Sequence, residues 1–218
     1  MRLLYYGCKC NLSIRNEMVS CAFIGHRKIE KTEELKEILT EVITSLIEED
    51  NADMFLFGSR SEFNELCYKV VTKLKERYPQ IKRIEVRSSN EELPQSYIDL
   101  ILKDYEGTFF PKQVSGAGNC SYIKRNQTMI DMCDVLVTYY DKNYKPTGRT
   151  RKSDKSGTEI AALYALKKKK QVINILDIIE DDEISLIDEN LITEKDVEFL
   201  KSIGVETDLE TLRYKVKK

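Results

Sequence analysis

Residues 156–175, SGTEIAALYALKKKKQVINI, predict a helix that leads directly into a strand, the repeating unit of an α/β fold. The helix opens on three small residues, Ser156, Gly157 and Thr158. Small residues leave the first backbone amides of a helix uncovered, and these amides together with the helix dipole favour an anion. The alternative is a plain helix cap, in which Ser156 or Thr158 hydrogen-bonds the backbone.

The same alternation of strands and helices runs through most of the chain. Short apolar runs predict strands over 19–24, 54–57, 81–86, 134–140 and 171–176. Apolar residues spaced three and four apart predict helices over 35–47, 63–74, 95–103 and 120–133, besides the helix that begins at residue 156. The segment 106–120, EGTFFPKQVSGAGNC, is expected to be irregular, and its Gly-x-Gly follows no predicted strand. Residues 142–155 are expected to form a loop and are a candidate lid.

This pattern predicts an α/β protein with a Rossmann-like three-layer fold and a mainly parallel sheet. The carboxyl ends of the parallel strands then meet at one edge, where such sheets bind ligands near the switch in strand order. Residues 19–176 are expected to form this domain and residues 1–18 an N-terminal extension. Residues 177–218 are expected to form a short acidic helical appendage, with Val197, Leu200 and Ile203 at helical spacing.

Composition narrows the class of protein. Apolar residues make up 41% of the 218 residues and charged residues 33%, which fits a folded domain rather than a disordered chain. No run of 18 apolar residues occurs, so we expect no membrane helix, and the first residues lack the apolar core of a signal peptide. From residue 177 onward the chain has 13 acidic and 6 basic residues, which leaves a mildly basic body. Such a body suits a small anionic ligand but lacks the dense basic stripe of a nucleic-acid-binding protein.

The six cysteines are expected to be reduced, which is typical of a cytoplasmic protein. Cys21, Cys67 and Cys133 lie within apolar patterns, where a thiol packs as a small hydrophobe. Cys8 and Cys10 could open a metal site, but the chain has no second Cys or His pair and a single histidine. We therefore predict neither a metal site nor a cofactor.

Four stretches fall at the carboxyl edge of the predicted sheet. The first is Gly25, His26 and Arg27, after the first strand. The glycine lets the backbone approach a ligand, and the two side chains can donate to a phosphate or carboxylate. The alternative is an ordinary turn with a solvated arginine.

The second stretch is Gly58, Ser59, Arg60, Ser61 and Glu62, after the second strand and at a helix start. Exposed amides and two hydroxyls make it a candidate anion pocket. In the alternative, Ser61 only caps the helix.

The third stretch is Tyr140 and Asp141, after the fourth predicted strand, with Arg125 and Asn126 on the helix before it. Asp141 is a candidate acceptor for ribose hydroxyls or a base, and Tyr139 or Tyr140 for stacking on a ring. The alternative is a strand end with a solvated carboxylate.

The fourth stretch is the opening one, Ser156 to Thr158, followed by Glu159. A carboxylate in the first turn suits the helix dipole and needs no catalytic role. Three of the four stretches contain a glycine, and we expect them to form the walls of one anion-binding cleft.

These stretches resemble the SLOG superfamily of Rossmann-like proteins, which groups DNA-processing and Lonely-Guy-type nucleotide binders, and in particular its small bacterial and prophage members. The resemblance lies in CAFIGHRK (21–28), FLFGSRSEFNELC (55–67), and RNQTMIDMCDVLVTYYD (125–141) together with 156–175. Ser156 stands where these relatives usually have the first glycine of Gly-Gly-Thr. The resemblance spans about residues 19–176 and implies a nucleotide-like ligand.

Some members of this superfamily are phosphoribohydrolases that cleave nucleoside monophosphates, and others are sensors of ADP-ribose-type signals. The hydrolases carry an arginine on the helix before the fourth strand, which Arg125 matches. They also carry a glutamate three residues after the threonine of their Gly-Thr turn, where this chain has Ala161. Glu159 lies two residues too early, on a different face of the helix. Such chemistry depends on a placed carboxylate, so half of the catalytic pair is missing.

The leading hypothesis is a cytoplasmic protein that binds a nucleotide or ADP-ribose-like molecule as a sensor or a sequestering protein. We expect no membrane or nucleic-acid partner, and the sequence leaves open whether the protein is a homo-oligomer or docks a basic partner through its tail. The alternative is a nucleotide N-glycosidase, similar to a phosphoribohydrolase, or a ribosyltransferase. Its candidate catalytic residues are Arg125, Asp141, Glu159 and Glu62.

Overall fold

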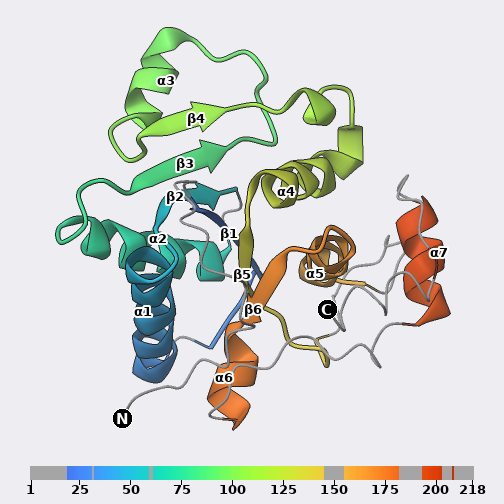
Figure 1. The fold of residues 1–218 in the computed structure, drawn as a ribbon. Coiled ribbons are helices and arrows are strands. Elements are labelled where there is room, and N and C mark those ends of the chain that lie inside the picture. Colours follow the sequence, from blue (N-terminus) through green and yellow to red (C-terminus); the bar gives the residue numbers. More distant parts are fainter. Residues whose placement is uncertain are drawn as a thin grey trace, which may run out of the picture.

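The structure is a computed structural model that describes residues 19–30, 32–58, 61–144, 155–181, 193–202 and 208. These residues form a six-stranded, entirely parallel sheet between two layers of helices (Figure 1). The predicted Rossmann-like three-layer α/β fold is therefore confirmed.

The sheet has the strand order β4-β3-β2-β1-β5-β6, which places β1 near the centre. The strands are β1 (Val19–Gly25), β2 (Ala52–Phe57), β3 (Lys82–Val86), β4 (Gly107–Phe109), β5 (Val135–Tyr139) and β6 (Gln171–Asn174). The chain builds outward from β1 to β4 and then returns to the other side of β1 with β5 and β6. The strand order therefore switches between β1 and β5, and we refer to their carboxyl ends as the switch point.

Two helical layers cover the sheet. Helices α1 (Glu33–Glu48), α2 (Glu62–Lys75) and α6 (Ile175–Asp181) pack on one face, and α4 (Ser121–Met132) and α5 (Gly157–Lys167) pack on the other. Helix α7 (Glu194–Ser202) packs against α5 on its outer side (Figure 1). In Figure 1, α1 and α2 lie to the left of the central strands, and α4 and α5 lie to the right. The helices that follow β1 and β5 thus leave the switch point toward opposite faces.

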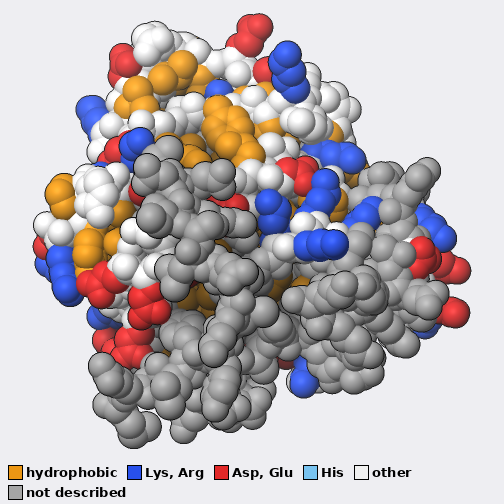
Figure 2. Space-filling view, viewed as in Figure 1, with side chains coloured by type: hydrophobic (Ala, Val, Ile, Leu, Met, Phe, Trp, Pro, Cys, Tyr) orange, Lys and Arg blue, Asp and Glu red, His pale blue; other side chains and the backbone are white. Residues whose placement is uncertain are grey.

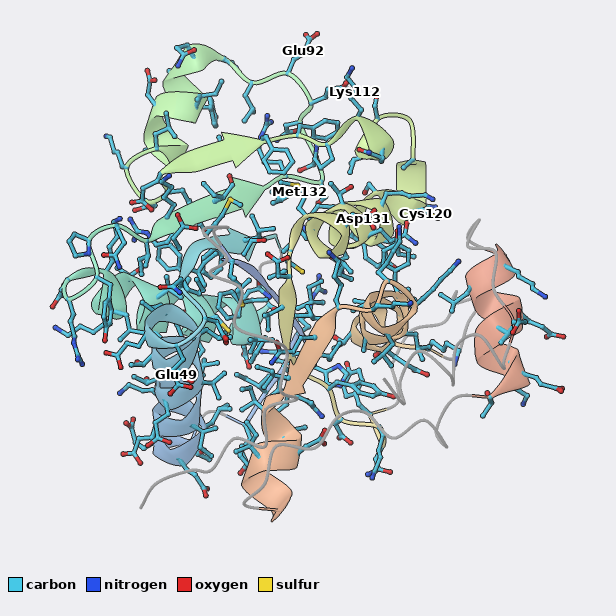
Figure 3. The ribbon with its side chains drawn as sticks, viewed as in Figure 1. Glu49, Glu92, Lys112, Cys120, Asp131 and Met132 are labelled. Atoms are coloured by element: carbon cyan, nitrogen blue, oxygen red, sulfur yellow. The ribbon has the colours of Figure 1, made fainter. Side chains whose placement is uncertain are left out.

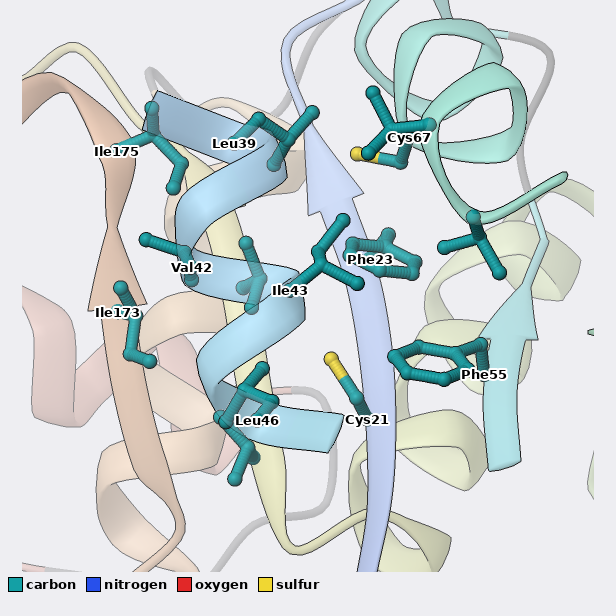
Figure 4. Packing of buried hydrophobic residues seen from close by; sticks show 14 of the residues in the cluster. Cys21, Phe23, Leu39, Val42, Ile43, Leu46, Phe55, Cys67, Ile173 and Ile175 are labelled. Carbon is teal, nitrogen blue, oxygen red and sulfur yellow. The ribbon is translucent and has the colours of Figure 1, made fainter. Parts of the chain in front are cut away.

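The first core cluster forms because apolar residues recur on one side of α1. That side buries Leu35, Leu39, Val42, Ile43, Leu46 and Ile47. They pack against inward side chains of β1 and β6 (Figure 4). Phe23 and Phe55, on neighbouring strands, stack with their ring centroids 6.0 Å apart. The cysteines that were predicted to be buried, Cys21, Cys67 and Cys133, are buried free thiols.

One strand was missed at the edge of the sheet. Residues 106–120 were expected to be irregular, but they contain β4 and the short 3-10 helices η1 (Lys112–Val114) and η2 (Gly118–Cys120). β4 has three half-buried residues, which is too short for a period of two to show in the sequence. The strand predicted as the fourth is therefore β5.

The end of the last strand was also predicted wrongly. It was expected to reach Leu176, but β6 ends at Asn174 and α6 begins at the next residue. Ile175 and Ile178 are buried in the core cluster that α1 lines, at helical spacing. Their burial against α1 favours a helix at residues 175 and 176, where the strand was expected to continue.

Helix α3 (Gln95–Ile101) joins β3 to β4 and buries none of its residues. Tyr97, Leu100 and the following Leu102 are 60%, 56% and 46% exposed. Figure 2 shows hydrophobic side chains at the surface over this part of the molecule, at the top of the view.

Near the carboxyl end of the chain, α7 contributes to a second core cluster, which α4 and α5 also line. Val197 and Leu200 are buried, as their helical spacing predicted, and Leu200 lies in the cluster that α5 also lines. The third residue of that pattern, Ile203, lies outside the described residues, as do residues 1–18 and most of the predicted loop over 142–155. No helix in the described ranges is long and apolar enough to cross a membrane.

Candidate functional site

The amino end of α5 is a helix cap that leaves two amides available. Ser156 caps the helix, because its Oγ accepts from the amide of Glu159 at 3.0 Å. Within the described part of the chain, the amides of Gly157 and Thr158 donate no hydrogen bond, and neither does the Thr158 hydroxyl. Thr158 is only 5% exposed. This end of α5 therefore combines the helix dipole with unused donors.

The amino end of α2 is more fully capped. Oγ of Ser61 accepts from both the backbone amide and the side-chain amide of Asn64, each at 3.2 Å. The amide of Glu62 donates to the carbonyl of Arg27 at 3.0 Å. In the predicted anion pocket after β2, Ser61 thus serves as the helix cap, while Ser59 and Arg60 lie outside the described residues.

Arg125 is the buried cation of this edge. It lies on α4, is 4% exposed, and donates from its guanidinium to the carbonyl of Gly58. Further donors reach Oδ1 of Asn126 at 3.0 Å and Oγ of Ser88 at 3.4 Å. The structure therefore brings together Arg125, Asn126 and Gly58, as part of the predicted site.

Among the residues that the structure describes, the charge of Arg125 has no close counter-ion. Burial lowers the pKa of Arg125 to about 10, and the negative charge of Glu85 opposes this shift. No carboxylate of the described residues lies within 4.0 Å of the guanidinium. Arg125 contrasts with the other buried arginine, Arg83, whose guanidinium pairs with Glu106 at 2.8 Å.

The three glycines of the edge differ in the space beside them. A Cβ at Gly25 would lie 2.3 Å from Cδ1 of Phe63, and a Cβ at Gly58 would lie 2.5 Å from Sδ of Met129. The side chains of Phe63 and Met129 thus fill the space beside Gly25 and Gly58 that a ligand would need in order to approach these glycines. At Gly157 the nearest atom would be Cε2 of Tyr122, at 3.5 Å, which is an ordinary contact. Of these three glycines, Gly157 is therefore the one at which a Cβ would meet no clash.

His26 joins the two strands of the switch point. Its backbone amide donates to the carbonyl of Tyr139 at 3.2 Å, and its Nε2 accepts from the amide of Asp141 at 3.0 Å. The side chain is 3% exposed, and its ring centroid lies 4.2 Å from that of Tyr144. Burial lowers the pKa of His26, and the backbone and charge of Asp141 and the charge of Glu159 oppose the shift. Nε2 of His26 thus accepts a hydrogen bond between β1 and β5, and it also lies 3.4 Å from the carbonyl oxygen of Asp141.

Among the candidate catalytic residues, Glu62 makes its contacts with the loop that follows β1. Its carboxylate accepts from the amide of Ile29 at 3.2 Å and pairs with Lys28 at 2.8 Å. The neighbouring Arg27 has an exposed side chain. These contacts tie the loop after β1 to α2.

The other two acidic candidates also have local partners. Glu159 pairs with Lys155 at 3.0 Å, one turn before it. Oδ1 of Asp141 accepts from the amide of Asn143 at 2.7 Å, which closes a turn directly after β5. Neither contact brings a carboxylate to Arg125.

Asn174 is a positioning residue that the sequence reasoning missed. It is 3% exposed, accepts from the amide of Tyr140 at 2.9 Å, and donates to the carbonyl of Tyr140 at 3.0 Å. It also donates to Asp177 at 2.9 Å. Burial raises the pKa of Tyr140 to about 12, with the charges of Glu159 and Asp141 adding to the shift. Asn174 could have been recognised in the sequence as the polar residue that ends an apolar strand.

Helices α4 and α5 are joined near both of their ends. Asp131 lies at the carboxyl end of α4 (Figure 3). It accepts from the hydroxyl of Tyr164 at 3.1 Å and pairs with Lys168 at 2.8 Å. At the opposite end, Tyr122 lies against Gly157. The pairing fixes the amino end of α5 beside the first turns of α4.

Within the described residues, no group of His, Cys, Asp and Glu side chains is arranged to hold a metal ion. A scan against protein-family models finds no family that matches this chain. A search of curated proteins finds none that matches it significantly. On the evidence of its own structure, the chain contains a Rossmann-like α/β domain with six parallel strands.

Proposed function

We propose that this protein binds a nucleotide or ADP-ribose-like molecule through its phosphate, at the carboxyl edge of the sheet between Arg125 and the amino end of α5. The observation that carries the proposal is Arg125, a cation that is 4% exposed and has no carboxylate of the described residues within 4.0 Å. Burying a charge costs free energy unless the charge is paired. A bound phosphate offers Arg125 the missing charge.

The first turn of α5 supports the same ligand. The unused amides of Gly157 and Thr158 point outward from the amino end of an 11-residue helix, where the dipole favours an anion. The Thr158 hydroxyl adds a donor with no partner in the described part of the chain. These groups lie on the helix that packs against α4, which carries Arg125.

The proposed role is binding, as a sensor or a sequestering protein. Ala161, at the position where the resembling hydrolases carry a glutamate, is 2% exposed and lies in the core cluster beneath α5. Glu159 is held by Lys155 at 3.0 Å. Nucleotide N-glycosidase or ribosyltransferase activity is the alternative, and release of free base from nucleoside monophosphates or NAD would reveal it.

Isothermal titration with AMP, ADP, ADP-ribose and NAD tests the proposal. We expect binding of at least one of these, and we expect Arg125→Met to weaken it at least about tenfold, since a hydrogen bond to a charged group contributes about 1.5–3 kcal/mol. The matched control is Arg83→Met, because Arg83 is also buried but already pairs with Glu106. This control should keep its affinity. Absence of binding to every probe by the folded protein overturns the proposal.

A further inference from the structure

An exposed aromatic ring flanks the amino end of α5. Tyr122 lies in the first turn of α4 and is 45% exposed. Its Cε2 is 3.5 Å from the point where a Cβ on Gly157 would lie. Its ring therefore stands at van der Waals distance from the first residue of α5, next to the unused amides.

Tyr122 also shares one side of α4 with the cationic group. Arg125 and Asn126 follow it by three and four positions, which places the three residues on neighbouring points of the helix surface. Nε of Arg125 donates to Oδ1 of Asn126 at 3.0 Å, so these two side chains are held together. A ligand whose phosphate contacts Arg125 and α5 thus has Tyr122 within its reach.

The other aromatic rings of this edge are already engaged. Tyr139 is 9% exposed and lies edge-on to His26, and Tyr144 packs on His26 with 4.2 Å between the centroids. Tyr140 is half-buried and lies 6.1 Å from His26. Among the described residues Tyr122 has neither a ring contact nor a hydrogen bond of its hydroxyl. Tyr122 is therefore the aromatic ring of this edge that keeps a free face.

We infer that Tyr122 is the stacking platform for the base of the ligand. This inference rests on the proposed function and narrows its ligand class to phosphate esters that carry an aromatic base. The base lies on the Tyr122 ring while the phosphate contacts Arg125 and the amides of α5. Stacking on an aromatic side chain tolerates every base, because each base has a π face. The site therefore selects nucleotides over sugar phosphates without selecting one base.

The test compares AMP with ribose 5-phosphate, which carries a phosphorylated ribose without a base. We expect the wild-type protein to bind AMP at least about tenfold more tightly, in the range that base stacking gives on alanine substitution. Tyr122→Ala should weaken AMP binding about tenfold and leave ribose 5-phosphate binding within about twofold. Tyr122→Phe keeps the ring and should bind AMP as the wild type does.

Tyr97→Ala is the matched control, because Tyr97 is 60% exposed on α3 and lies on a different part of the molecule (Figure 1). Thermal unfolding of each variant verifies that it is folded, and removal of either exposed ring should shift Tm little. If wild-type protein binds AMP and ribose 5-phosphate equally, or if Tyr122→Ala keeps full AMP affinity, the role of Tyr122 is overturned and the proposed function stands. If the folded wild type binds neither probe, both are overturned.

Discussion

The amide of Asp141 donates a hydrogen bond to Nε2 of His26 at 3.0 Å, and this bond links the carboxyl ends of β1 and β5. The same two strand ends are linked a second time, from the amide of His26 to the carbonyl of Tyr139 at 3.2 Å. An imidazole nitrogen accepts a hydrogen bond only while it is unprotonated. The hydrogen bond from the amide of Asp141 therefore requires Nε2 of His26 to be unprotonated, whereas a protonated Nε2 would face the carbonyl oxygen of Asp141 at 3.4 Å.

The stability of the protein should fall as His26 is protonated. Burial lowers the pKa of His26 in the folded state below its ordinary value of 6.5. Between the folded and the unfolded pKa the unfolded chain binds more protons, so this contribution is fully present above about pH 6.5 and is lost as the pH falls through the folded pKa. Urea unfolding at about pH 7.5 and about pH 5.5 measures the loss, which should be smaller in His26→Gln.

His26 is the single histidine of the chain, so its ring signals can be followed by NMR without assignment of other histidines. They should titrate below pH 6.5 in the folded protein. A titration midpoint above that value would contradict the role given to the His26–Asp141 bond.

Arg125 and Arg83 should respond differently to removal. Arg83 is 8% exposed and its guanidinium pairs with Glu106 at 2.8 Å, so Arg83→Met leaves Glu106 only the more distant Lys75, at 3.7 Å, and should lower the free energy of unfolding by about 2–3 kcal/mol. Arg125→Met removes a buried charge without a close counter-ion, and this gain offsets its lost hydrogen bonds, so the change should stay within about 1 kcal/mol. Chemical denaturation of the two variants without ligand gives both values. A larger loss for Arg125→Met than for Arg83→Met would refute this account.

Two glycine-to-alanine substitutions should differ in their effect on stability, because only one of the two sites has a side chain where a Cβ would lie. A Cβ at Gly25 would lie 2.3 Å from the ring of Phe63, so Gly25→Ala overpacks the core and should cost about 1–3 kcal/mol of stability. At Gly157 the nearest atom would be 3.5 Å away, and alanine favours a helix, so Gly157→Ala should change stability by less than about 1 kcal/mol. Thermal unfolding monitored by circular dichroism compares them. Equal destabilisation by the two substitutions would be inconsistent with this packing.

Thiol labelling should distinguish Cys120 from the core cysteines. Cys120 is exposed, whereas Cys21, Cys67 and Cys133 are buried, and burial raises the pKa of the Cys133 thiol to about 12. A thiol must ionise to react, so iodoacetamide should modify Cys120 in the native protein and the three buried residues only after unfolding. Peptide mass spectrometry reads each position. Rapid native labelling of Cys21 would mean that the core opens far more readily than its packing implies.

The sequence predicted the layers of this fold because its apolar periods are long and regular. Helix α1 and strand β1 carry unbroken patterns, and they appear where the patterns place them. Strand β4 could not be found in this way, since three half-buried residues at a sheet edge carry no readable period. The position of the carboxyl edge followed from the fold class, and the turns at Gly25 and Gly58 lie on it.

The contacts within the edge were less predictable. Arg125 and Gly58 are 67 positions apart, and their contact depends on how α4 is rotated on the sheet. Nε2 of His26 accepts from the amide of Asp141, a partner 115 positions away in the sequence, and no local pattern indicates this contact. Residue type shows which chemistry is available at such a position, whereas packing decides which neighbour uses it.

The central place of β1 has a consequence for synthesis of the chain. Ile24 in β1 accepts a hydrogen bond from Thr138 in β5, a partner 114 positions later. At roughly 5–20 residues per second, the ribosome needs roughly 6–23 s to make that partner after β1 has been synthesised. Through this interval β1, whose five middle residues are buried in the folded protein, has one bare edge, which is a template for aggregation. During synthesis this edge of β1 therefore stays open to pairing with another chain until β5 emerges and closes the sheet.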